Sequence, residues 1–180
     1  MSAKQEPKPS PFLEEGHDHG RCIRDALAEA GAVCMDRGVR LTALRRRVLE
    51  IIWQSHRPLG AYSILDWLRQ DGRSAAPPTV YRALEFLLQQ GLIHRIASLN
   101  AFVGCVHPGH VSGGQFLLCR ACGTSAELHD GELTKMIIHS AAALGFRTEC
   151  QTIELAGLCP RCQPSPAATD RSKARPRQRP

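Results

Sequence analysis

The sequence contains few aromatic residues and no long hydrophobic run. Aromatic side chains make up only 5% of the 180 residues, so a core must be built mainly from Leu, Ile, Val and Ala, which favours helical packing over a large β-sandwich. No apolar stretch approaches the ~20 residues that cross a bilayer, and residues 1–20 lack the apolar segment of a secretory signal. Because the 43% hydrophobic content is that of a folded protein, disorder throughout the chain is excluded. We therefore expect a cytoplasmic protein with no membrane partner.

The chain also lacks the setting in which its eight cysteines would form a disulfide framework. The expected compartment is reducing, and the chain is long enough to bury a core without covalent cross-links. Cys22 and Cys34 lie on or beside the apolar stripe of a helix expected over residues 22–37, which is typical of small buried side chains. For the remaining cysteines, metal binding is the first hypothesis to consider.

The formal charge of +6 is unevenly distributed along the chain. Residues 38–97 hold nine Lys/Arg and four Asp/Glu, a net charge of +5, and residues 165–180 contribute a further +4. Residues 98–164, which contain the other six cysteines, carry a net charge of −1. A basic segment of this kind indicates a nucleic-acid partner, because Lys and Arg neutralise phosphates.

The basic segment has the pattern of three short helices followed by a β-hairpin. Thr42 and residues 77–79 are expected to cap helices, and Gly72 to end one. This order is typical of a winged helix-turn-helix. The three helices with their caps, and then the two strands, are expected over residues 42–55, 59–72, 77–91, 92–97 and 101–106.

A second, cysteine-rich unit follows a turn-rich linker. Hydrophobic periodicity predicts two strands, a helix and a third strand, which is an α+β arrangement. These elements are expected over residues 115–118, 125–128, 133–144 and 147–155.

Two Cys-x-x-Cys hooks lie at the two ends of this unit. Cys119 and Cys122 form the first hook, and Cys159 and Cys162 form the second. Two such hooks close a tetrahedral four-thiolate site, and soft thiolate ligands with no fifth donor predict a structural zinc. The alternative is a redox dithiol, but a redox dithiol normally uses a single hook at the start of a helix, whereas the first hook here follows a strand.

A second group of potential metal ligands is spread along the chain: His94, Cys105, His110 and Glu127. Each residue alone has an ordinary explanation, as a core histidine, a buried thiol or a solvated side chain. Together they supply two imidazoles, a thiolate and a carboxylate. This set fits tetrahedral zinc better than iron, which usually takes nitrogen and oxygen ligands in such sites. The spacing alone leaves the question open.

The helix expected to end at residue 91 has one face suited to reading DNA. Its apolar stripe points one way, while Arg82 lies on the opposite face with Tyr81 at the edge. Arg82 is placed to contact guanine, and Tyr81 to stack or to contact a thymine methyl group. Arg40 and Arg45 are expected to neutralise phosphates. The alternative is an ordinary solvated helix face.

Taken together, these residues resemble the ferric uptake regulator superfamily, and within it the zinc uptake regulators. The resemblance spans roughly Cys22 to Cys162 and rests on the segment Pro77–Leu84, the two cysteine hooks and the His, Cys, His, Glu set. It implies a winged-helix DNA-binding domain followed by an α/β dimerisation domain, in a homodimeric, metal-dependent repressor.

The resemblance also implies roles for individual residues. A regulatory zinc at the domain junction would be bound by His94, Cys105, His110 and Glu127, with His107 as a competitor of His110. The residues implied to contact double-stranded operator DNA are Thr79, Tyr81 and Arg82 in the recognition helix, and Tyr62 in the helix before it.

We therefore predict an α+β protein with an N-terminal winged helix-turn-helix and a small α/β dimerisation domain that holds a four-cysteine zinc site. The predicted function is a zinc-responsive repressor of zinc uptake and zinc homeostasis genes, acting as a homodimer with two zinc ions per subunit and no small organic substrate. The alternatives are an iron- or peroxide-responsive regulator on the same scaffold, a winged helix that binds proteins, and a zinc-ribbon enzyme, for which the sequence offers no catalytic grouping. The expected segments are a disordered arm (1–20), the DNA-binding domain (21–106), a linker (107–114), the dimerisation domain (115–163) and a disordered basic tail (164–180).

Overall fold

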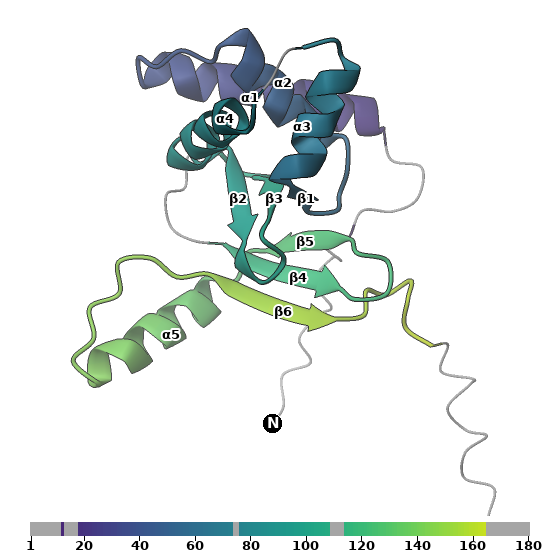
Figure 1. Ribbon diagram of the computed structural model, residues 1–180. Helices are drawn as coiled ribbons and strands as arrows, with labels where there is room; N and C mark the ends of the chain where they lie inside the picture. Colours follow the sequence, from purple (N-terminus) through teal and green to yellow (C-terminus); the bar gives the residue numbers. More distant parts are fainter. Residues whose placement is uncertain (1–11, 13–17, 74–75, 109–113, 165–180) are drawn as a thin grey trace, which may run out of the picture.

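The computed structural model describes residue 12 and residues 18–73, 76–108 and 114–164. In this part of the chain, a helical unit with a small sheet is followed by a second sheet with one helix (Figure 1). The helices are α1 (His19–Asp36), α2 (Ala43–Trp53), α3 (Ala61–Gln70), α4 (Pro77–Gln89), α5 (Gly131–Ala143) and the short 3-10 helix η1 (Ala97–Leu99). The strands are β1 (Leu59–Gly60), β2 (Ile93–Ile96), β3 (Ala101–Gly104), β4 (Gln115–Cys119), β5 (Ser125–Leu128) and β6 (Ile153–Gly157).

The predicted arm over residues 1–20 and the predicted tail over residues 164–180 fall almost entirely outside the described residues. None of the described helices is both long and apolar enough to cross a membrane.

The helices of the first unit begin close to the expected positions. The backbone of Thr42 is extended and its side chain accepts a hydrogen bond from Arg45 N (3.4 Å), as an N-cap does. The start of α4 differs from the expectation, because Pro77 and Pro78 lie inside the first turn and the N-cap is Ala76 rather than Thr79. Proline is tolerated in this turn because the first N–H groups of a helix have no partner within it.

The core of the helical unit is aliphatic, as the composition predicts. Helices α2, α3 and α4 contribute most of it, and α1 packs across them through Leu27, Ala30 and Cys34. Cys34 is only 2% exposed, which confirms it as a small core residue. The fully buried side chains of these three helices include Val48, Leu49, Ile51, Ile52, Ile64, Leu68, Leu84 and Leu87.

The expected hairpin forms as β2 and β3, and a third strand extends it. β1 pairs antiparallel with β3, with Leu59 opposite Phe102. The sequence predicts the start of a helix at residues 59–60, and this is wrong for those two residues. A two-residue strand is too short to show the alternation that marks strands, so only its partner strand determines its conformation.

The second sheet has the order β5-β4-β6, with β4 antiparallel to β5 and parallel to β6. A parallel pair needs a crossover, and α5 lies within that connection. β6 begins at Ile153 rather than at Arg147, because the chain must first return from the end of α5, where Gly145 turns it with a φ of 76°. Figure 1 shows α5 extending away from the rest of the structure, and no residue of this fully described helix is buried.

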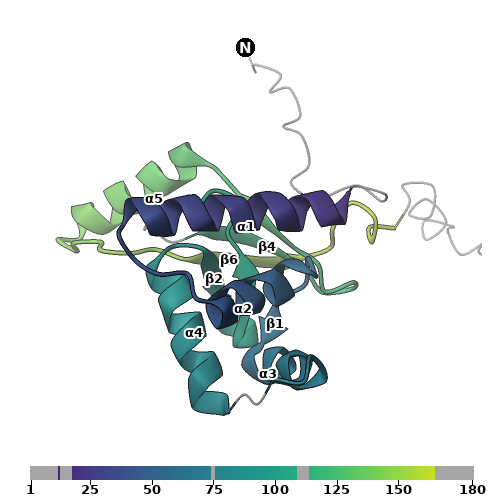
Figure 2. The same cartoon turned by 90° about the horizontal axis from the view of Figure 1, so that it is seen from above.

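The β2–β3 hairpin rests on the second sheet (Figure 1). Ile96 packs with Phe116 in a small buried cluster. The carboxylate of Glu154, on β6, accepts hydrogen bonds from the N–H groups of Ala97 (2.6 Å) and Ser98 (3.2 Å). Hydrogen bonds from Ser98 and Ala97 lower the pKa of Glu154. Seen from above, α3 and α4 extend away from α5, on the other side of α1 (Figure 2).

Gly104, at the end of β3, supplies a test of how the hairpin packs against α2. A Cβ atom on Gly104 would lie 2.5 Å from Trp53 Nε1, closer than real contacts allow. Gly104→Ala should therefore lower the free energy of unfolding by about 1–3 kcal/mol, the usual cost of overpacking. The matched control is Gly31→Ala in α1, where a Cβ atom meets nothing within 4 Å and helix propensity should add about 1 kcal/mol of stability. Urea unfolding measures both variants, and an unchanged stability of Gly104→Ala would contradict the packing described.

Candidate functional site

The first candidate site is a cluster of four cysteine sulfurs, from Cys119, Cys122, Cys159 and Cys162. In the parallel pairing of β4 with β6, Cys119 lies opposite Gly157, so the second hook begins two residues beyond the same end of the sheet. Each hook is a tight turn: Gly123 N donates to Cys119 O, and Cys162 N donates to Cys159 O, both at 2.9 Å. The sheet register therefore brings together two hooks that are far apart in sequence.

The sulfur positions fit a tetrahedral zinc ion. All four Sγ atoms lie within 4.8 Å of one another, and those of Cys122 and Cys159 are 3.8 Å apart. A tetrahedral site with zinc–sulfur bonds of about 2.3 Å requires sulfurs about 3.8 Å apart. A disulfide bond requires about 2.05 Å. The cluster is therefore suited to a metal ion rather than to a disulfide bond.

Hydrogen bonds lower the pKa values of both thiols in the first hook and so favour the thiolates that bind a cation. Hydrogen bonds from the backbone N–H groups of Cys122 and Cys159 lower the pKa of Cys119 to about 6. The Cys159 nitrogen lies 3.4 Å from Cys119 Sγ. Thr124 Oγ1 lies 3.3 Å from Cys122 Sγ and lowers the pKa of that thiol. The thiolate is the form that binds zinc, so these hydrogen bonds favour the ligand form of Cys119.

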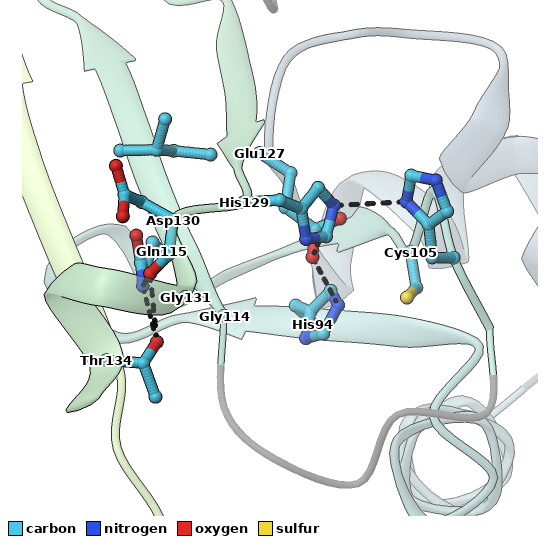
Figure 3. Close-up of a pocket in the computed structure, with 11 residues that line it drawn as sticks. His94, Cys105, Gly114, Gln115, Glu127, His129, Asp130, Gly131 and Thr134 are labelled. Carbon is cyan, nitrogen blue, oxygen red and sulfur yellow. Dashed lines mark hydrogen bonds and ion pairs between the residues drawn. The ribbon is translucent and has the colours of Figure 1, made fainter. Parts of the chain in front are cut away.

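The second candidate site lies where the hairpin meets the second sheet. His94 lies on β2, Cys105 directly follows β3, and Glu127 lies on β5. Their ligand atoms all lie within 4.8 Å of one another, and we call these three residues the junction cluster. Cys105 N donates to Leu92 O (3.1 Å), which closes the hairpin and fixes the thiol near His94. The structure therefore brings together three residues of the predicted four-residue set (Figure 3).

The junction cluster is buried and short of hydrogen bonds. The side chains of His94 and Glu127 are 12% and 8% exposed, and Cys105 is 3% exposed. Among the described residues, His94 Nε2 has no hydrogen-bond partner, and it lies 3.5 Å from Glu127 Oε1, longer than a good hydrogen bond. Two nitrogen or oxygen ligands of a tetrahedral zinc lie about 3.4 Å apart. The buried nitrogen and the carboxylate are therefore spaced as metal ligands are.

Burial sets the protonation of the junction cluster. Desolvation lowers the pKa of His94 and so favours the neutral imidazole, which offers a lone pair. Burial, followed by the charge of Glu127, raises the pKa of Cys105 to about 12. The thiol therefore loses its proton at neutral pH only when a cation compensates the thiolate charge. Imidazole, thiolate and carboxylate together form a ligand set that zinc accepts.

Three further histidines belong to this region of the chain: His107, His110 and His129. His110 lies outside the described residues, so its place as a ligand stays a prediction. His107 is described, but it is not part of the junction cluster. Its Nδ1 lies 3.0 Å from Nε2 of His129, which in turn lies 3.7 Å from Glu127 Oε1. No sequence pattern indicates His129, because a single histidine in a loop carries no signal and only the fold places it here.

The residues of α3 and α4 that are expected to contact DNA are exposed to solvent. Tyr62 and Tyr81 are 69% and 48% exposed and line the same small hollow between the two helices. Thr79 and Arg82 are exposed and lie one helical turn apart, so they share a face of α4. Large exposed aromatic side chains next to an arginine are suited to a binding surface.

Arg45, one of the two arginines expected to bind phosphates, also has partners within the protein, as does the neighbouring Arg47. The Arg45 guanidinium stacks on Phe86, 3.5 Å from the ring centroid, and donates to Arg40 O (2.7 Å). Arg40 is exposed. Arg47 binds Asp71 (Nη2 to Oδ1, 2.8 Å) and lowers the pKa of that carboxyl. Arg45 therefore also orients α4 against α2, which composition alone does not indicate.

Comparison with known proteins gives the family of the chain. Residues 36–156 match the family model for the ferric uptake regulator family. The chain is 40% identical over 143 residues to the zinc uptake regulation protein of Escherichia coli (strain K12), across 77% of this chain and 82% of that protein. A crystal structure of holo XcZur is similar, with a TM-score of 0.72 and 41% identity over 77% of this chain and 96% of that chain. A zinc uptake regulator complexed with zinc and DNA has a TM-score of 0.74 and 36% identity over 78% of this chain and 94% of that chain. The chain belongs to the ferric uptake regulator family.

Proposed function

We propose that this protein is a zinc-responsive, DNA-binding transcriptional repressor of zinc uptake and zinc homeostasis genes, and that it acts as a homodimer with two zinc ions per subunit. The observation that carries the proposal is the meeting of His94 and Cys105, from the hairpin, with Glu127, from the second sheet. A ligand set divided between two units lets a single ion fix their relative orientation. Relatives named for zinc uptake regulation, and a similar structure with zinc and DNA, support this function.

The residues of the junction position the hairpin, and through it α4. Bound zinc would supply coordination bonds to His94, Cys105 and Glu127, and we propose His110 as the fourth ligand. Glu127 Oε2 also accepts the N–H of Val106 (3.3 Å), so the carboxylate holds the chain directly after Cys105. Because β2 follows α4 closely in the chain, a fixed hairpin gives α4 a fixed orientation relative to the second sheet.

We infer that the switch acts through geometry rather than charge. Metal loading with loss of the Cys105 proton changes the formal charge of a subunit by only about +1, and this charge is largely screened beyond ~8 Å. In a symmetric dimer, the two recognition helices must match half-sites about 34 Å apart. Tyr81 and Arg82 reach base edges only when both helices are spaced in this way. Zinc selects the competent spacing, and zinc and operator binding are therefore reciprocally coupled.

The surface proposed for dimerisation is formed by α5 and the second sheet. β6 is an edge strand and α5 buries none of its residues in the single chain, so a second copy would cover both. We assign DNA binding to residues 21–106 and dimerisation to residues 115–163, joined by residues 107–114. The exposed apolar side chains of this surface are Met136, Ile138, Leu144, Phe146 and Leu155.

Removal of a junction ligand should abolish zinc-dependent DNA binding. Cys105→Ser and His94→Ala should each weaken binding at least about ten-fold at a free zinc level that saturates the wild type, because a lost ligand lowers metal affinity. The measurement is a gel shift at buffered free zinc, with a DNA fragment selected from a random pool by the wild-type protein.

The matched control for these variants is Cys150→Ser, which removes an exposed thiol outside both clusters. Variants that keep the four-cysteine zinc and still bind DNA as tightly as the wild type at every zinc level would contradict the proposal. DNA binding that depends on iron, with one tightly held zinc per chain, would favour the iron-responsive alternative.

Removal of a hook cysteine should affect folding rather than sensing alone. Cys159→Ser leaves three thiolates, so we expect the zinc content to fall from two ions to about one per chain and the midpoint of thermal unfolding to fall. Elemental analysis and a thermal melt measure the two effects, again with Cys150→Ser as the control. If Cys159→Ser retained both the zinc content and the melting temperature of the wild type, the structural assignment of this cluster would fail.

A further inference from the structure

Beside the junction cluster, two more histidines face each other. His107 follows β3 and His129 follows β5, and Nδ1 of the first lies 3.0 Å from Nε2 of the second, with the rings nearly perpendicular at 88°. Both residues are exposed and lie outside helices and strands. Two imidazole nitrogens directed at each other accommodate either a shared proton or a metal ion. Zinc–nitrogen bonds of about 2.0–2.1 Å place two ligand nitrogens about 3.3 Å apart, close to the spacing found here.

The histidine pair shares a ligand atom with the junction cluster. Glu127 Oε1 lies 3.7 Å from His129 Nε2 and 3.5 Å from His94 Nε2. The other carboxylate oxygen is used by the N–H of Val106. Figure 3 shows the Glu127 carboxylate between the rings of His129 and His94. Glu127 Oε1 therefore faces both the exposed imidazole of His129 and the buried imidazole of His94.

Exposure decreases from the histidine pair to the junction cluster. The side chain of His129 is 52% exposed and that of Glu127 8%, while Cys105 is 3% exposed. All of these residues line one cavity of about 300 Å³. A cation from solution therefore meets the histidine pair before it reaches the thiol.

We propose that His107, His129 and Glu127 form an acquisition site that binds Zn²⁺ from solution and transfers it to His94 and Cys105. This inference rests on the proposed function, because the junction cluster is the destination of the ion. Glu127 would stay bound during the transfer, because zinc can expand from four to five ligands. The imidazoles of His107 and His129 would bind the ion through a ring nitrogen each and be released as it moves. Cys105 gives its proton to solvent as the zinc–sulfur bond forms, so charge and protons balance.

The test follows the arrival of a metal ion at Cys105. The full chain, with zinc in the four-cysteine cluster and the junction cluster emptied by a mild chelator, is mixed rapidly with Co²⁺. The thiolate-to-cobalt charge-transfer absorption then reports the ion that has reached Cys105. We expect His129→Ala to slow the appearance of this band about ten-fold at limiting Co²⁺, the low end of the effect of losing a supporting residue at a metal site. The final amplitude should equal that of the wild type.

Two variants separate this role from a structural one. His129→Gln keeps a side chain that can hydrogen-bond to His107 but is a poor zinc ligand, so it should be as slow as His129→Ala. His19→Ala removes a histidine at the start of α1, outside the cavity, and should load at the wild-type rate.

Three results would overturn the proposal. An unchanged loading rate in His129→Ala would remove the acquisition role while leaving the proposed function intact. A lower final amplitude in His129→Ala would make His129 a permanent ligand instead. The absence of the charge-transfer band in the wild type would contradict the junction centre itself, and the acquisition site with it.

Discussion

The buried carboxylate of Glu127 joins the hairpin to the second sheet at the junction cluster. Among the described residues, its polar contacts are the imidazoles of His94 and His129 and the N–H of Val106. The Glu127 side chain is only 8% exposed, and none of these described contacts is with a permanent cation. Burying such a carboxylate costs several kcal/mol. In the proposed mechanism, a divalent ion in the junction cluster offsets this cost, and the ion binds there once His94 and Cys105 approach from the hairpin. Metal binding in the junction cluster and the docking of the hairpin on the second sheet are then one equilibrium.

Other contacts between the two units favour the same orientation, among them the buried packing of Ile96 against Phe116. Glu154 accepts N–H groups of η1, and the N–H and hydroxyl of Ser125 donate to His56 O at 2.9 and 3.2 Å. A neutral hydrogen bond contributes about 1 kcal/mol, and one to a charged carboxylate about 1.5–3 kcal/mol. Such contacts allow the docked arrangement to form without holding it against alternatives. In the proposed mechanism, zinc then shifts a population that already exists, and the exposed histidine pair would set how fast the shift follows a change in free zinc.

Local patterns in the sequence predict most of the fold, and long-range packing determines the rest. Helical periodicity and the Cys-x-x-Cys spacing are properties of neighbouring residues, so the helices of the first unit and the composition of the four-cysteine cluster follow from them. β1 depends on its partner strand, and the start of β6 depends on where α5 ends. The spacing of His94, Cys105 and Glu127 leaves their meeting undecided, because that meeting requires two separately folded units to dock. His129 has no sequence signal at all, and the stacking of Arg45 on Phe86 is visible only in the packed helices.

The central claim is that zinc in the junction cluster fixes the spacing of the two recognition helices in a dimer. The most direct measurement is the distance between spin labels carried by an unnatural amino acid at the exposed position of Gln89, one in each subunit. We expect a broad distribution when only the four-cysteine clusters hold zinc. We expect a single narrow distribution once the junction clusters are loaded, at a helix spacing compatible with half-sites about 34 Å apart. The same distribution with and without zinc in the junction clusters would contradict the proposed switch.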